Sequence, residues 1–183
     1  MKALSVLQPW ASLTVIVDPK TGKACKQIET RSRNTSHRGP LLIHASISFK
    51  ALHRDLCLTE PFFSAIKRSG LLMRDHTGCH MYGRYHLPLG AIIGMVNVVD
   101  SFPVEALTQN GMRMHVAEDG NLAWLTEQEL AFGDYSPGRY GYLLSDPVVF
   151  AEPIPAKGML GLWTPDDETM IKVNQALAAT EAA

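Results

Sequence analysis

The sequence predicts an α+β fold, a small twisted β-barrel with helices packed on its outside. Short strand-forming segments follow one another at irregular intervals, separated by turns and by one helical insert, and this spacing does not fit a βαβ series. A length of 183 residues and an apolar fraction of 46% suffice for one buried core. We therefore expect one domain, without internal repeats.

The first elements are short. Residues 2–7 favour a strand, and residues 8–17 favour a helix with Pro9 in its first turn. A turn-rich connection leads to a strand over residues 26–31, which contain Ile and Thr, two good strand formers. A loop then leads to a further strand over residues 41–46, which ends in small and hydroxyl side chains.

The middle of the chain is expected to be helical and then irregular. Ser46 or Ser48 can cap a helix that runs to about Cys57, and a second helix-start signal lies at Thr59. Residues 70–86 show no clear period, so we interpret them as a loop excursion from the barrel.

The strongest strand signal is the nearly continuous run of β-branched residues over residues 90–100. A loop or short helix, from residue 122, breaks at residues 133–138 before a strand over residues 139–144. A strand, a Pro-punctuated loop and a closing strand follow over residues 148–163. The acids after Pro165 favour a terminal helix that runs to about residue 179.

Charge and cysteine content limit the class of protein. The net charge of −1 gives no bulk attraction to nucleic acid, but residues 18–38 are basic and residues 100–135 are acidic. The basic segment can form a patch that binds phosphates. Alternatively, the basic and acidic segments can neutralise each other in the fold. Three cysteines do not form an even disulfide framework. With no signal peptide and no apolar run of membrane length, we expect a cytoplasmic protein that does not contact a membrane.

The stretch from Lys26 to Arg31 places an acid between two bases. In a strand the side chains alternate, so Ile28 and Thr30 face a core while Glu29 and Arg31 share the opposite face. Lys26 then lies at the start of the strand. This arrangement is the first candidate site.

Other candidate residues each have a functional and a structural interpretation. His44, on one strand face with Ser46, is a proton shuttle or a core histidine bonded to backbone. Arg139 holds a phosphate or carboxylate, or forms a surface ion pair, and Tyr140 beside it can stack on a base. Lys157 projects from a Pro-fixed loop, at a cleft rim or into solvent.

The sequence favours no metal and no cofactor. The His and Cys residues of the middle segment match no standard pair-and-pair spacing of zinc ligands; they are His76, Cys79, His80 and His86. Phosphate-cradling glycine motifs are absent from the sequence, and its Ser, His and Asp residues form no nucleophile elbow.

Several blocks together resemble the ASCH family, whose members have a PUA-like β-barrel. These blocks are "LSVLQPWASL", the K-x-x-E-x-R motif, "RGPLLIHAS", "LPLGAIIGMV", "FGDYSPGRY" and "PIPAKGMLGLW". They occur in the order that the family has. The resemblance implies an ASCH domain over residues 2–163, followed by a C-terminal helical extension over residues 164–183.

The resemblance also implies where the site lies. The family has a cleft lined by a G-x-K-x-x-E-x-R motif and associated with RNA or nucleotide-like ligands. Here the motif gives Lys26, Glu29 and Arg31, while Ala24 stands in place of its Gly. In this interpretation Lys26 supplies a charge or an activatable amine. Glu29 accepts hydrogen bonds from a base edge or orients Lys26, and Arg31 braces Glu29.

Three functions are consistent with this resemblance. The first is an RNA- or nucleotide-binding module without turnover, which uses the basic cleft around the motif. The second is a hydrolase, a ribonuclease or an amidohydrolase of the N4-acetylcytidine type, with Lys26 and Glu29 as catalytic residues. Small bacterial members with that amidohydrolase activity carry a Thr at the position of Glu29. The third is a regulatory protein that binds a protein partner through the same cleft. We rank them in this order.

Overall fold

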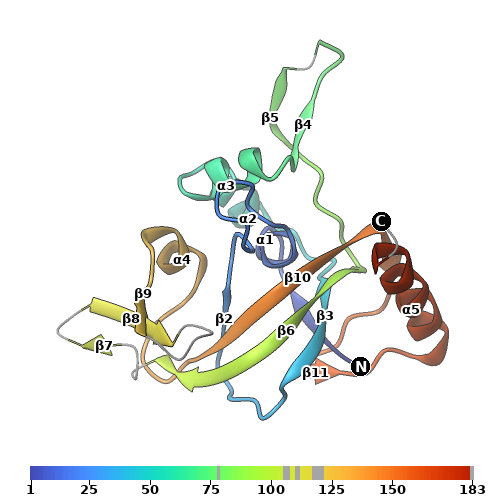
Figure 1. Ribbon diagram of the computed structural model, residues 1–183. Coiled ribbons are helices and arrows are strands. Elements are labelled where there is room, and N and C mark those ends of the chain that lie inside the picture. The colour runs from blue at the N-terminus through green and yellow to red at the C-terminus, as the bar shows by residue number, and fades with distance from the viewer. Residues whose placement is uncertain (78, 105–107, 110–111, 117–121, 182–183) are drawn as a thin grey trace.

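The computed structural model describes residues 1–77, 79–104, 108–109, 112–116 and 122–181. Its largest element is a curled six-stranded sheet with the strand order β11-β1-β3-β6-β10-β2 (Figure 1). The pair β1 and β3 is parallel, and the other pairs are antiparallel. The sheet strands are β1 (Lys2–Val6), β2 (Ile28–Arg31), β3 (Gly39–Ala45), β6 (Ala91–Pro103), β10 (Tyr140–Pro155) and β11 (Leu162–Trp163).

The remaining elements surround this sheet or extend from it. The described helices are α1 (Trp10–Val15), α2 (Ala51–Leu56), α3 (Phe62–Arg68), α4 (Glu127–Phe132) and α5 (Asp167–Glu181). Two small sheets consist of β4 (Leu72–Arg74) with β5 (His80–Tyr85), and of β7 (Thr108–Gln109), β8 (Met112–Val116) and β9 (Leu122–Trp124). The predicted α+β fold, a curled sheet with helices on its outside, is confirmed.

Both faces of the sheet are apolar because different helices cover them. Along β3, Leu41 and Ile43 pack in one cluster with Val15 of α1, whereas Leu42 packs in another cluster with Val173 of α5. This alternation is the period of two that a strand imposes. The terminal helix therefore shares the core of the sheet. The domain boundary after residue 163 stays a prediction.

The strand predicted from the run of β-branched residues forms β6, which lies inside the sheet. β6 pairs with β3 on one side and with β10 on the other. Gly94, within β6, has no room for a side chain, since a Cβ atom there would lie 2.2 Å from the carbonyl oxygen of Val148. Glycine thus permits the close approach of β6 and β10.

Two sequence-based predictions of secondary structure are wrong. Part of residues 70–86 forms the antiparallel hairpin β4–β5, which projects from the body as Figure 1 shows. Its register shifts between Leu72 and Arg74, which hides the period of two. The strands expected over residues 139–144 and from residue 148 are one strand, β10, whose pairing with β6 shifts at three places.

No described helix is long and apolar enough to cross a membrane.

Candidate functional site

A pocket of about 460 Å³ lies where β1, β2 and α1 meet the segment that follows α4. Glu29, Thr30 and Arg31 of β2 form one wall. The other lining residues are Ser5, Val6, Leu7, Trp10, Ser46, Ala131, Phe132, Gly133, Asp134 and Arg139. The volume falls in the range of small-molecule sites, roughly 300–1,000 Å³. The pocket therefore suits a small molecule or a single nucleotide of a longer chain.

Lys26 is the most deeply placed charged residue of the motif. Its side chain is 1% exposed, and its Nζ lies 3.0 Å from Oε2 of Glu29. The same ammonium donates to the carbonyl oxygen of Ile28, and the Lys26 backbone N–H donates to the carbonyl of Leu13 at 2.9 Å. These contacts place Lys26 beneath the pocket wall, where it supports Glu29 without lining the pocket.

Glu29 pairs with Lys26 and brings its own carboxylate to the pocket wall. Its side chain is 9% exposed, and its Oε1 lies 3.4 Å from the Nη1 of Arg31. The carboxylate is thus held on one oxygen by an ammonium and on the other by a guanidinium. Because an ionised carboxylate only accepts hydrogen bonds, Glu29 presents acceptors to a ligand that donates N–H or O–H groups.

The strand register of the motif follows the predicted alternation in part. Ile28 is buried in a cluster with Phe102 and Leu143, as predicted. Thr30 is also buried, but its Oγ1 accepts the backbone N–H of Asp134 at 2.9 Å, and the residue reaches the pocket wall. The side of β2 opposite Glu29 therefore meets the segment after α4 as well as the core.

Arg139 enters the same pocket from the start of β10. Its Nη1 lies 3.2 Å from Oδ2 of Asp134, and its Nη2 donates to the carbonyl of Thr30 at 3.3 Å. Its Nε is buried and meets no hydrogen-bond acceptor among the described residues. The side chains of Arg31 and Arg139 are 31% and 27% exposed, so both guanidinium groups remain accessible to an anion.

An aromatic residue forms the apolar side of the pocket. Trp10 is half-buried at the start of α1 and packs edge-on against Phe62, with ring centroids 5.7 Å apart. Sequence reasoning placed Trp10 within a predicted helix and did not name it as a site residue. The same reasoning missed Asp134, because nothing in the sequence places residue 134 beside residue 30.

Besides Lys26, three of the predicted site residues do not line this pocket. His44 lies on the Leu42 face of β3, where its Nε2 contacts the carbonyl oxygen of Ala156 at 3.0 Å. Burial lowers the pKa of His44, which favours the neutral imidazole, and the bond to Ala156 opposes this only in part. Tyr140 packs against the core cluster of α1, and Lys157 is exposed on the loop after β10.

His44 and Ser46 are separated because β3 ends between them. The expectation that they share a strand face requires the strand to continue, but β3 ends at Ala45. Ser46 instead donates its backbone N–H to the carbonyl of Val6 at 2.8 Å and lines the pocket. His44 matches the alternative of a core histidine bonded to backbone.

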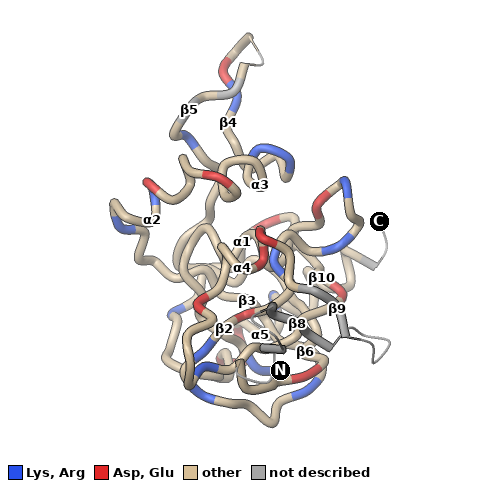
Figure 2. The backbone as a smooth tube through the Cα atoms, turned by 90° about the vertical axis from the view of Figure 1, so that its left-hand side faces the viewer, with Lys and Arg blue, Asp and Glu red and all other residues tan. Residues whose placement is uncertain are grey.

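The basic and acidic segments of the sequence meet in the fold. Arg38 lies 2.6 Å from Asp100, and Glu129 accepts backbone N–H groups of residues 27 and 28. Figure 2 shows both signs of charge distributed along the chain. Among the described residues, no group of three or more His, Cys, Asp or Glu side chains is arranged to hold a metal ion.

Fold and pocket together define an α+β protein with a half-barrel sheet and a charged pocket at the end of β2. No protein-family model matches the sequence, and comparison with curated proteins finds no relative. Similar solved structures include the ASCH protein from Zymomonas mobilis, with 16% identity, and a mutant of it, with 17% identity. Both alignments cover 95% of this chain and reach a TM-score of 0.45, and they cover 93% and 96% of those proteins. Their family is the one that the sequence resembles.

Proposed function

We propose that the pocket binds an unpaired base of RNA, or a nucleotide-like small molecule, without breaking a bond. The observation that carries this proposal is the carboxylate of Glu29, which is held in the pocket wall between Lys26 and Arg31. A base edge with amino or imino N–H groups supplies the donors that such a carboxylate requires.

The rest of the pocket is consistent with such a ligand. Trp10 lines the pocket, and stacking of a base on an aromatic side chain contributes about 1–3 kcal/mol. Arg31 and Arg139 can pair with a phosphate at the edge of the pocket. A volume of about 460 Å³ favours a single nucleotide over a duplex.

The second candidate is hydrolysis of RNA or of a modified nucleoside. The observation in its favour is the contact of 3.0 Å between Lys26 and Glu29, which couples an amine and a carboxylate as acid–base catalysis requires. However, Lys26 is 1% exposed and its ammonium is bonded to Glu29 and to the carbonyl of Ile28. A lysine held in this way is poorly suited to attack a ligand in the pocket. Binding therefore ranks first.

A panel of nucleotides, modified nucleosides and short single-stranded RNAs tests the proposal. Binding is measured by calorimetry for the parent and for Glu29→Gln, and the reaction mixtures are examined by mass spectrometry. We expect Glu29→Gln to weaken binding at least about fivefold, on the order of 1 kcal/mol, as for a lost hydrogen bond to a charged group.

The matched control is Glu152→Gln, which neutralises an exposed acid outside the pocket. Glu152→Gln should bind as the parent does. Cleaved or deacylated products would establish the hydrolase instead. Failure of the parent to bind any member of the panel would overturn the proposal and favour a protein partner.

A further inference from the structure

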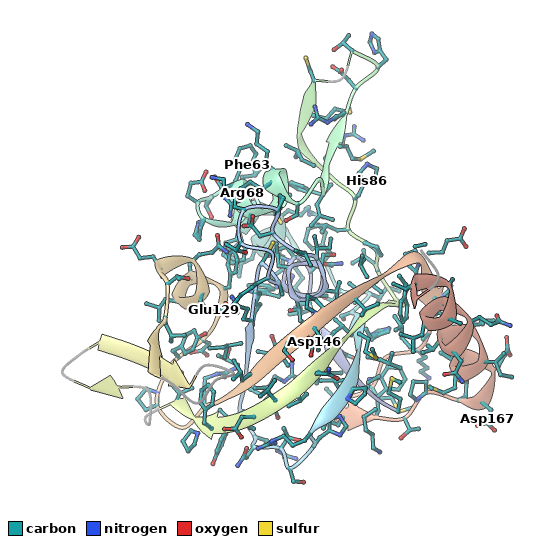
Figure 3. All side chains as sticks on the ribbon, viewed as in Figure 1. Phe63, Arg68, His86, Glu129, Asp146 and Asp167 are labelled. Atoms are coloured by element: carbon teal, nitrogen blue, oxygen red, sulfur yellow. The ribbon has the colours of Figure 1, made fainter. Side chains whose placement is uncertain are left out.

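Glu129 of α4 holds the backbone of the motif at a point between Lys26 and Glu29. Its Oε2 accepts the N–H of Gln27 at 2.9 Å, and its Oε1 accepts the N–H of Ile28 at 3.0 Å. Glu129 is only 6% exposed. Carboxylates are rarely buried without partners, so these two hydrogen bonds account for its burial. Figure 3 labels it on α4, on the side that faces β2.

The helix that carries Glu129 is itself fixed in place. The side chain of Thr126 caps α4 by accepting the N–H of Glu129 at 3.1 Å. Gln128, the preceding residue, donates from its Nε2 to the carbonyl of Cys25 at 3.0 Å. Gln128 also accepts from Arg68 at 2.9 Å, and Arg68 pairs with Asp18 at 2.9 Å. Two adjacent side chains of α4 therefore bond the backbone of residues 25–28.

Glu129 and Lys26 are connected through the backbone of Ile28, to which both side chains bond. Glu129 holds the N–H of Ile28, while the ammonium of Lys26 holds the carbonyl of the same residue. The orientation of Ile28 thus determines where Lys26 can place its ammonium and, one residue later, where Glu29 leaves the backbone. Glu129 does not line the pocket that contains Glu29, so its influence passes through the backbone.

We propose that Glu129 is a positioning residue, which sets the geometry of the Lys26–Glu29 pair and thereby the affinity of the pocket. The effect on affinity rests on the proposed function, whereas the effect on the pair does not. The carboxylate suits this task because each of its two oxygens can accept one of two adjacent backbone N–H groups. An amide in its place presents one oxygen and one NH₂ group. One of the two backbone N–H groups would then face this NH₂ group, which is also a donor.

The first experiment is a double-mutant cycle of Glu129→Gln and Glu29→Gln, with the nucleotide that the parent binds best in the panel. We expect Glu129→Gln alone to weaken binding about tenfold, and to weaken it less than twofold further when Glu29→Gln is already present. Equal losses in both backgrounds would overturn the proposal, because a residue that acts only on overall stability does not depend on Glu29. Unchanged affinity in Glu129→Gln would overturn it too.

The second experiment needs no ligand and separates this proposal from the proposed function. Amide hydrogen exchange is measured by NMR for Gln27 and Ile28, together with the ammonium signal of Lys26. In Glu129→Gln we expect exchange at both amides to quicken at least about tenfold, and the ammonium signal to weaken, with β3 and β6 unaffected. Unchanged exchange and an unchanged ammonium signal would overturn the positioning role. Changed exchange in a protein that binds no nucleotide would leave that role standing and remove only the proposed function.

The matched control is Glu127→Gln, which removes an exposed carboxylate two residues earlier on α4. It should leave both amides, the ammonium signal and the affinity unchanged. If Glu129→Gln does not fold, Glu129→Asp replaces it, because it keeps the charge and shortens the side chain by one methylene. Glu129→Asp is then expected to change both measurements in the same direction but less, and its equality with the parent would overturn the proposal.

Discussion

The ammonium of Lys26 lies 3.0 Å from a carboxylate oxygen of Glu29, and the two side chains are 1% and 9% exposed. A charge that has been removed from water to this extent depends on its partner. Removing one member of a buried pair leaves the other uncompensated, whereas removing both does not. The pair is therefore important for folding as well as for the pocket.

Lys26→Met is expected to lower the free energy of unfolding by about 3 kcal/mol, because Glu29 loses its buried counter-charge. The double variant with Glu29→Gln should be less destabilised than Lys26→Met alone. Urea denaturation measures both. Lys172→Met serves as the control, since it breaks an exposed ion pair with Glu168 and should cause no measurable change. A Lys26→Met protein as stable as this control would contradict the importance of the pair.

The two exposed arginines of the pocket should govern the salt dependence of RNA binding. Each guanidinium that pairs with a phosphate releases a counterion, which contributes about 0.7 to the slope of log K against log salt for a single strand. Arg31→Gln and Arg139→Gln are therefore each expected to flatten this slope by about that amount. The measurement is a titration with a short single-stranded RNA at several salt concentrations.

Lys157→Gln is the matched control for these arginines. Lys157 is an exposed cation that does not line the pocket, so its removal should leave the slope as in the parent. A slope that flattens in Lys157→Gln, and not in the two arginine variants, would place the phosphate contacts on the loop after β10.

Local patterns in the sequence predicted the features that depend on neighbouring residues. The β-branched run over residues 90–100 indicated a strand, which the structure confirms as β6. The spacing of Lys26, Glu29 and Arg31 indicated an acid held between bases, and both ion pairs are present. In each case the relevant contacts lie within a strand or within a few residues of it.

Features that depend on distant segments were not predictable in this way. Glu129 contacts residues about 100 positions earlier in the chain, and only the packing of α4 against β2 brings them together. Tyr140 and Arg139 are adjacent in sequence, yet only Arg139 lines the pocket. The hairpin β4–β5 was missed because a shifted register removes the regular alternation by which a strand is detected.

Gly94→Ala is expected to destabilise the protein by about 2–3 kcal/mol. A Cβ atom at Gly94 would lie 2.2 Å from the carbonyl oxygen of Val148 and 3.1 Å from the side chain of Val15. Because the first of these contacts is with backbone, β6 and β10 must separate to relieve it. Thermal or urea denaturation measures the loss.

The control for Gly94 is Gly22→Asn. Gly22 has a φ of 69°, and a Cβ atom there meets nothing within 4 Å. Asn tolerates this left-handed conformation better than most residues, so Gly22→Asn should retain nearly the stability of the parent. Equal stability of the two variants would show that the sheet adapts to a side chain at Gly94 without cost.

His44 should make the stability of the protein fall as the pH drops through the range of histidine titration. Burial lowers the pKa of His44 below its ordinary value of 6.5, so the folded state favours the neutral ring. Below that value the unfolded chain binds a proton that the folded protein does not, and this binding favours unfolding. The contribution of His44 is therefore fully present above about pH 6.5 and is lost as the pH falls toward the folded pKa. Because His44 binds at most one proton on unfolding, it changes the free energy of unfolding by at most about 1.4 kcal/mol per pH unit.

His44→Gln tests this dependence, because the glutamine amide can still donate to the carbonyl of Ala156 but does not titrate. The free energy of unfolding is measured at pH 7.5 and at pH 5.5 for the parent and for the variant. We expect the parent to lose more stability between the two values than His44→Gln does. His76→Gln, which changes an exposed histidine of the hairpin turn, should behave as the parent. If the parent and His44→Gln lost the same amount, His44 would not be the group that binds the proton on unfolding.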